Sequence, residues 1–285
     1  HNSLSDETWV ISNAAEQKLL KKIISNSKKL EEYVGVMGKY GIKTGLTEAF
    51  VLDPSKAEEL FQINPKNRNH IFPFLSGREI KPYLSGTSSN YLIKFEKGFT
   101  NKNGGSQPEN WFRTEFPDLA MHFDQFKEKA QARADKGDFY WELRACDYYD
   151  LFQKPKIMYQ VLQVKPCFIY DEDGLFCNNS MWFIPTSDKV LLGILNSSMG
   201  WWLISKYCSA IQNGYQLIWK YFSQIPIAIG NAPVRQEVKN AVEEILLVKK
   251  LNPSADTSVQ ESAIDQLVYQ LYGLSPEEIA LVEGS

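Results

Sequence analysis

The sequence predicts an α+β protein, in which a strand-rich body carries inserted helices and ends in a helical C-terminal segment. Residues 155–185 alternate β-forming side chains around a turn at residues 171–174, which is typical of a hairpin or a three-stranded meander. Beyond residue 233, apolar side chains recur at helical spacing. A chain of 285 residues that is 44% hydrophobic is long enough for one substantial core, or for a large domain with a smaller one.

The first half of the chain is expected to mix short helices with extended segments. Apolar residues at helical spacing predict a helix over residues 13–31. Glycines interrupt residues 34–52, which we expect to form short strands joined by turns. A short helix is predicted over residues 55–61. Residues 86–110 are rich in Gly, Ser and Asn around a strand-like segment at residues 91–95, and are predicted to form a long surface loop.

The second half is expected to become increasingly helical. Apolar positions predict one amphipathic helix over residues 119–130 and another over residues 192–206. After a proline-bounded stretch, two more helices are expected, with Gly273 as a C-terminal cap and Ser275 restarting a helix. We therefore expect three parts, which are an N-terminal linking helix (1–32), a body (33–230) and a helical segment (231–285).

The charge of the chain is unevenly distributed. The whole sequence has 31 Lys and Arg against 34 Asp and Glu, which gives a net charge of −3. Residues 231–285 have 4 basic and 9 acidic residues, so residues 1–230 have 27 basic and 25 acidic residues. This distribution permits a local basic surface in the body. No run of eighteen apolar residues is present, so we expect no membrane span. The chain begins at His1 without a leader, and we expect a cytoplasmic piece of a longer protein.

Catalytic signatures are missing from the sequence. Its three histidines are not spaced as metal ligands, and its four cysteines form no Cys-x-x-Cys pair, so we expect free thiols and no zinc site. Phosphate-binding glycine loops and a nucleophile elbow are also absent. The Asn-Pro-Pro-Tyr type of motif that grips a flipped base is approached only at residues 53–54 and 64–65, without the second proline or the ring. We expect no catalytic residue in this chain.

Two glycine-punctuated basic motifs are the main candidates for function. The first, residues 40–45, contains Lys43, Thr44 and Gly45, and the second, residues 75–83, contains Arg78 and Lys81. Glycine lets backbone N–H groups approach an anion closely, and Arg can donate two hydrogen bonds to guanine or to a phosphate. Each motif is equally typical of an ordinary turn with a solvated or ion-paired cation.

Further polar residues could contact DNA. Arg144 lies in a Trp-Glu-Leu-Arg segment, and Lys154 and Lys156 alternate with apolar neighbours at the start of a predicted strand. The amide-rich turn at residues 211–216 could bond to adenine edges in the major groove. Its candidate residues are Gln212, Asn213 and Gln216. Solvated lysines and a plain hairpin turn are the structural alternatives.

Taken in order, these segments resemble the TaqI-like C-terminal specificity domain, the target-recognition domain of single-chain type II (type IIG-like) restriction-modification enzymes. The resemblance extends from about residue 33 to 283. The matching stretches are residues 41–45, 49–52, 71–80, 116–119, 141–144, 152–157, 191–197 and 264–279. One departure is Thr47, where the family usually has Asn.

The resemblance implies a domain that binds double-stranded DNA and presents a target adenine to an upstream methyltransferase domain. It implies S-adenosylmethionine and Mg²⁺ as cofactors of the parent enzyme, a site-specific adenine DNA methyltransferase with possible endonuclease activity, and no cofactor in this chain. One alternative is a protein-interaction scaffold that docks through the acidic helices. Another is a stand-alone nuclease built on Asp53, Glu79 and Lys81, whose Glu-x-Lys spacing also occurs by chance.

Overall fold

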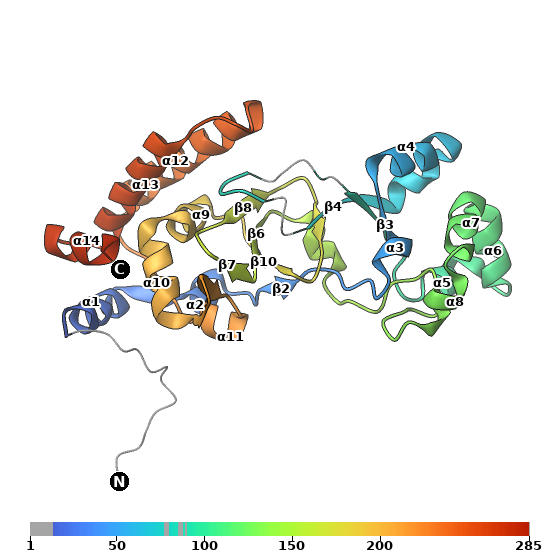
Figure 1. Cartoon of the computed structure of the whole chain (residues 1–285), viewed down its shortest axis with the longest axis horizontal. Helices are drawn as coiled ribbons and strands as arrows, with labels where there is room; N and C mark the ends of the chain where they lie inside the picture. The colour runs from blue at the N-terminus through green and yellow to red at the C-terminus, as the bar shows by residue number, and fades with distance from the viewer. Residues whose placement is uncertain (1–13, 77–79, 85–87, 89, 285) are drawn as a thin grey trace, which may run out of the picture.

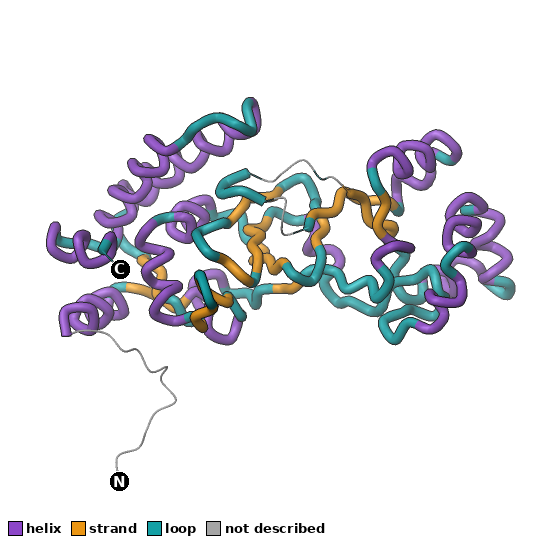
Figure 2. Tube along the Cα trace, in the orientation of Figure 1, coloured by secondary structure: helices purple, strands orange, loops and turns teal. Residues whose placement is uncertain are grey.

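The computed structural model describes residues 14–76, 80–84, 88 and 90–284, and it confirms the α+β class. Figure 1 shows an elongated molecule with helices at both ends and strands between them. The same division is visible by colour in Figure 2, where most strands lie in the middle third. Two hydrophobic cores account for this shape, one on each side of the central strands.

A four-stranded antiparallel sheet separates the two cores. Side chains alternate between its two faces. In the strand formed by residues 156–160, Ile157 and Tyr159 enter the first core, whereas Met158 enters the second. Both faces are covered, which explains why these strands are almost continuously hydrophobic. The strand order is β2 (Lys39–Tyr40), β10 (Met181–Pro185), β6 (Lys156–Gln160) and β8 (Phe168–Asp171).

The first core lies between this sheet and the N- and C-terminal helices. Gly193 allows two of these helices to pack closely, because a Cβ there would lie 2.9 Å from Val242 Cγ2. Residues 14–32 and 231–284, expected as a linking helix and a C-terminal segment, join the same core as residues 157–228. The surrounding elements are α1 (Ala14–Ser25), β1 (Ser27–Lys29), α2 (Leu30–Val34), α9 (Lys189–Asn196), α10 (Ser198–Tyr207), α11 (Trp219–Phe222), β13 (Pro226–Ala228), α12 (Ala232–Leu251), α13 (Ser258–Leu271) and α14 (Pro276–Glu283).

The second core is rich in aromatic rings. The His70 ring stacks on Phe95 at 4.6 Å, and burial lowers the pKa of His70 to about 4. A second sheet of order β3-β5-β4-β9 lines this core, and its last pair is parallel. The elements are α3 (Thr47–Phe50), β3 (Val51–Leu52), α4 (Pro54–Ile63), η1 (Pro65–Asn69), β4 (Ile71–Leu75), β5 (Asn90–Ile93), α5 (Phe99–Gly104), α6 (Pro108–Glu115), α7 (Pro117–Asp124), α8 (Lys127–Ala132), η3 (Tyr149–Gln153) and β9 (Phe176–Cys177).

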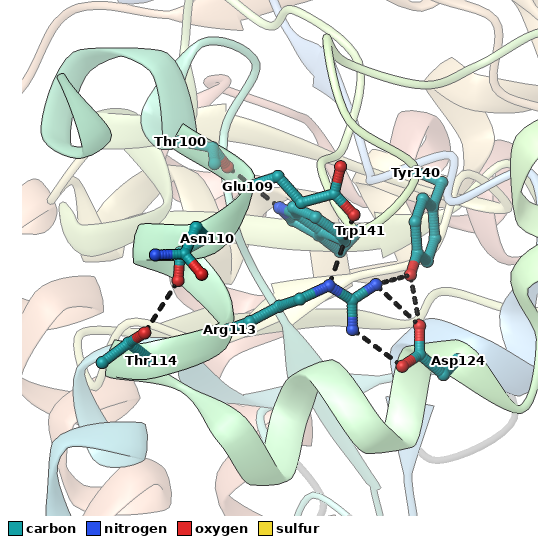
Figure 3. Close-up of polar contacts among 8 residues, drawn as sticks. All are labelled: Thr100, Glu109, Asn110, Arg113, Thr114, Asp124, Tyr140 and Trp141. Carbon is teal, nitrogen blue, oxygen red and sulfur yellow. Dashed lines mark hydrogen bonds and ion pairs between the residues drawn. The ribbon is translucent and has the colours of Figure 1, made fainter. Parts of the chain in front are cut away.

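A polar network ties α6 and α7 to the segment that follows α8 (Figure 3). Arg113 donates two hydrogen bonds to the Asp124 carboxylate, from Nη1 to Oδ2 at 2.8 Å and from Nη2 to Oδ1 at 3.1 Å. Its hydrogen bonds lower the pKa of Asp124 to about 2. The Tyr140 hydroxyl donates to the same carboxylate at 2.5 Å. The network therefore anchors the irregular segment that contains Asp135 and Arg144.

Several predicted elements differ in extent from the structure. The expected loop over residues 86–110 instead contains α5 and the start of α6, because aromatic side chains there pack into the second core. The helix expected over 192–206 is divided at Ser197, whose hydroxyl accepts a hydrogen bond from Gly200 N and so caps α10. Likewise, the helix expected over 119–130 is two helices, and that over 13–31 ends at Ser25 before β1.

The expected C-terminal signals are confirmed. Gly273 has a φ of +64°, and Ser275 forms a reciprocal capping box with Glu278 at the start of α14. Among the described helices, none is long and apolar enough to cross a membrane.

Candidate nucleic-acid interface

The first glycine-basic motif begins in β2 and passes very close to residues 177 and 178. Gly41 N donates to Met181 O at 2.9 Å, and Ile42 N donates to Cys177 O at 2.6 Å. A Cβ on Gly41 would lie only 2.1 Å from Asn178 O. Glycine is therefore required at position 41 for close backbone approach, and not for a positive φ.

The second motif, residues 75–83, begins on the opposite side of residues 177 and 178 from the first motif. Leu75, the last residue of β4, pairs with Cys177 of β9 in parallel, and Leu75 O accepts a hydrogen bond from Asn178 N at 3.1 Å. Ile42 also pairs with Asn178 in parallel. Neighbouring strands lie about 4.8 Å apart, so the two motifs start roughly 10 Å from each other and run in the same direction.

The described end of the second motif, residues 80–83, lies away from the first motif. Arg78 lies outside the described residues. Lys81 is exposed in a turn that leads to buried Tyr83, whose N–H donates to Phe168 O at 3.0 Å. That contact places the turn beside β8, at the edge of the central sheet opposite β2. The structure therefore does not bring Lys81 to Lys43.

One carboxylate joins two of the predicted cations. Lys43 Nζ lies 2.8 Å from Asp135 Oδ2, and Arg144 Nη1 lies 3.3 Å from Asp135 Oδ1. Arg144 Nη2 also donates to the Tyr40 hydroxyl at 2.6 Å. The hydrogen bond from Lys43 lowers the pKa of Asp135. This cluster has two positive charges against one negative charge, so it retains an excess positive charge at an accessible surface.

Thr44 and Gly45 shape the backbone beside this cluster. Arg133 is buried, and its Nη1 donates to Thr44 O at 2.5 Å, while its Nη2 donates to Tyr140 O and Glu142 O. Gly45 has a φ of +69°. Thr44 is itself buried, and its carbonyl is held by Arg133, so the DNA contact expected of Thr44 stays a prediction.

An amide-rich turn that the sequence reasoning missed lies between the two motifs. Asn178 Oδ1 accepts hydrogen bonds from Ser180 N at 3.2 Å and from Ser180 Oγ at 2.6 Å. Asn179 and Ser180 are exposed. The polar Asn-Asn-Ser run between two β-forming segments was a turn signal that could have identified it.

Backbone pairing continues from this turn to the hairpin at residues 209–216. Val161 N donates to Ser180 O at 3.2 Å, and Val161 O accepts from Leu217 N at 2.7 Å. Next, β7 (Leu162–Gln163) pairs with β12 (Gly214–Gln216), and β12 with β11 (Ser209–Ile211). The candidate interface is therefore formed by residues 40–45, 144, 161–164, 178–180 and 209–216.

The hairpin exposes the amides singled out from the sequence. Gln212 and Asn213 are the exposed turn residues, and Gln216 is half-buried in β12. Within the described part of the chain, none of these three side chains has a hydrogen-bond partner. The Asn-Gly pair has an unexpected role here, because Gly214 is a strand residue where a Cβ would lie 2.0 Å from Gln163 O.

The structure contradicts the expectation for Lys156. Its side chain is fully buried, and its ammonium donates to Phe152 O at 2.6 Å and to the Asp171 carboxylate. Lys156 therefore cannot contact DNA at this surface. Lys154 is exposed, but it precedes the end of β6 that pairs with Pro185, whereas the candidate interface adjoins the Gln160 end.

The described residues offer no support for a metal-dependent site. No group of three or more His, Cys, Asp or Glu side chains that could hold a metal ion is found in that part of the chain. Asp53, invoked for a nuclease, is the N-cap of α4 and accepts from Lys56 N at 2.9 Å. Glu79 lies outside the described residues. All four cysteines are free.

Fold and sequence together define the class of protein. Residues 72–227 match the model of the TaqI-like C-terminal specificity domain family. The match includes more than half of the chain, and the chain therefore belongs to this family of specificity domains. The resemblance inferred from the ordered sequence segments is confirmed.

The comparison with solved structures gives two restriction enzymes, of which the first has a similar fold. One is the type IIL restriction-modification enzyme MmeI in complex with DNA, with a TM-score of 0.60, 13% identity, and coverage of 87% of this chain and 35% of that chain. The other is the type IIG restriction endonuclease BpuSI, with a TM-score of 0.48, 13% identity, and coverage of 90% and 32%. The chain thus spans about a third of the length of each enzyme.

Proposed function

We propose that this chain is a DNA sequence-recognition domain that binds duplex DNA through the candidate interface. The observation that carries the proposal is the convergence of the cationic first motif, the turn at residues 178–180 and the amide-rich hairpin on one continuous run of paired backbone. Membership of a specificity-domain family supports the same role.

The two kinds of side chain in the interface suit the two tasks of sequence recognition. In this proposal Lys43 and Arg144 contact phosphates, which fixes the position of the DNA but carries no sequence information. Asn179, Gln212 and Asn213 are exposed amides, which can read base edges in the major groove. Lys81 and Lys154 lie away from this cluster and remain proposed contacts to the DNA backbone, and Arg78, which is outside the described residues, remains a proposed contact too.

We further propose that the chain has no catalytic role of its own. In a longer parent protein it would present a target adenine to a methyltransferase domain that uses S-adenosylmethionine, next to a nuclease domain that uses Mg²⁺. The MmeI structure supports this, because a similar fold there forms about a third of a restriction-modification enzyme bound to DNA. We expect the parent enzyme to work in the cytoplasm.

Binding to randomised duplexes at several salt concentrations tests the proposal. Phosphate contacts release counterions, so the logarithm of the affinity should fall linearly with the logarithm of the salt concentration. Lys43→Ala should lower that slope by about 1 without changing the selected sequence. Lys66→Ala is the matched control, since Lys66 is an exposed, ion-paired lysine on η1, outside the candidate interface. An affinity that does not change with salt concentration would contradict the proposed phosphate contacts.

A further inference from the structure

The sheet that carries the hairpin exposes apolar side chains on one face. In β7 and the residue after it, Leu162 and Val164 are 55% and 64% exposed, whereas Gln163 between them is buried. Ile211 of β11 is 36% exposed. Strand side chains alternate between faces, so Leu162 projects from the outer face, opposite to buried Gln163, and the exposed Val164 follows just beyond the end of β7.

Strand pairing shows which other residues share this outer face. Gln216 lies directly opposite Leu162, and Ser209 lies directly opposite Gln216. Directly paired residues project to the same side of a sheet, so the face combines three apolar side chains with one amide. Ile211, two residues after Ser209, belongs to it by alternation.

The opposite face of the same sheet is unfavourable for DNA. Tyr215 packs edge-on against Trp201, with ring centroids 5.2 Å apart. Both rings line a cavity of about 570 Å³ whose rim also includes the carboxylates of Glu261, Asp265 and Glu283. Such carboxylates repel phosphates, so the outer face is the more favourable side of this sheet for a duplex.

We propose that the outer face contacts the 5-methyl groups of thymines in the major groove and so favours A·T base pairs. This inference rests on the proposed function. Thymine is the base that displays a methyl group in the major groove, and apolar side chains recognise it by contact. Gln216, which is paired directly with Leu162, has an amide of the kind that bonds bidentately to adenine. A single A·T pair therefore offers a methyl group for the apolar side chains and an adenine edge for the amide.

Continuity with the rest of the candidate interface favours DNA over a protein partner here. Val161, which precedes β7, is hydrogen-bonded to Ser180 of the turn at residues 178–180, and that turn adjoins the first motif, residues 40–45. The apolar residues alternate with amide and hydroxyl side chains, whereas a protein-docking core excludes most polar groups. The groove of B-DNA also admits a β-ribbon of this size.

Replacing thymine by uracil tests the proposal, because it removes only the methyl group. The 285-residue chain is first used to select its binding site from randomised duplexes, and each thymine of that site is then replaced by deoxyuridine. Wild type should bind at least one such duplex about fourfold more weakly, the effect of losing one buried methyl contact. In Leu162→Ala or Val164→Ala, the same replacement should have no effect.

Matched variants separate this contact from general damage. Leu251→Ala and Val259→Ala remove apolar side chains that are 78% and 79% exposed from α12 and α13, and they should keep the full sensitivity to deoxyuridine. Two results would overturn this inference alone. One is sequence-specific binding whose affinity does not change with deoxyuridine at any position, and the other is a loss of affinity with deoxyuridine that is the same in Leu162→Ala and Val164→Ala as in wild type. If the chain selects no sequence at all, the proposed function fails as well.

Discussion

Gly41 shows how the candidate interface depends on a single missing side chain. Its backbone passes so close to Asn178 that a Cβ would lie 2.1 Å from the carbonyl oxygen, a contact that only a backbone shift can relieve. The same approach sets the spacing between the first motif and the turn at residues 178–180. A substitution at this position should therefore affect stability and DNA binding together.

We predict that Gly41→Ala lowers the free energy of unfolding by about 1–3 kcal/mol, the usual cost of overpacking. Gly230→Ala is the control, because a Cβ there meets nothing within 4 Å, and it should be neutral or stabilising by about 0.4–1 kcal/mol. Urea denaturation measures both. Equal effects of the two variants would show that the approach at Gly41 is not tight.

Lys156 illustrates a limit of sequence reasoning at the residue scale. Its alternation with apolar neighbours correctly indicated a strand, yet the same pattern fits a lysine facing solvent or one facing the core. The partner that decides between them, Asp171, lies 15 residues away and is brought near only by pairing of β6 with β8. Lys43 and Arg144 likewise share Asp135, which no sequence spacing could reveal.

Removing the Lys156 ammonium should be strongly destabilising. Lys156→Met leaves the Asp171 carboxylate buried without its counter-ion, and we predict a loss of about 3–5 kcal/mol in the free energy of unfolding. Lys154→Ala, an exposed neighbour, should change it by less than about 0.5 kcal/mol. If both variants unfold at the wild-type denaturant concentration, the buried pair does not stabilise the fold.

At the element scale, the hairpin and the first motif have separable roles. The hairpin at residues 209–216 and its amide-rich tip were foreseeable, because turn-forming residues stood between β-forming ones. The turn at residues 178–180 was overlooked, and its position between the motifs follows from the parallel pairing of β4 with β9. Pairing between distant strands is a tertiary feature, so local sequence patterns do not reveal it.

Removing the hairpin amides should alter the sequence preference of the chain. It should have little effect on the salt dependence of binding. We predict that Gln212→Ala with Asn213→Ala relaxes the preference at one or two base pairs by about 1–3 kcal/mol each and leaves the salt slope as in wild type. Selection from randomised duplexes followed by salt titration checks both effects. A lower slope with an unchanged consensus would instead assign the hairpin to phosphate contact.

At the scale of the whole molecule, two cores on either side of one sheet hold the interface in place. The α+β class and the C-terminal helices could be predicted from periodicity. The division into two cores could not, because it depends on both faces of β6, β8 and β10 being covered. The acidic helices α13 and α14 border the cavity behind the hairpin, which leaves the outer face of the hairpin sheet for DNA.

The second core should make the chain sensitive to acid. Burial lowers the pKa of His70 from 6.5 to about 4, so between these values the unfolded chain binds more protons than the folded chain. Stability should therefore fall as the pH decreases from 6.5 to 4, with His70 accounting for on the order of 1 kcal/mol after allowance for solvent screening. Urea denaturation of wild type and His70→Gln at pH 7 and pH 5 measures this. A steeper pH dependence in His70→Gln than in wild type would contradict it.

Hydrogen exchange in the presence and absence of selected duplex DNA tests whether the candidate interface binds DNA. DNA should slow exchange in residues 40–45, 161–164, 178–180 and 209–216, and leave α13 and α14 unchanged. Protection confined to those acidic helices, or no protection in the four interface segments while the DNA is bound, would contradict it.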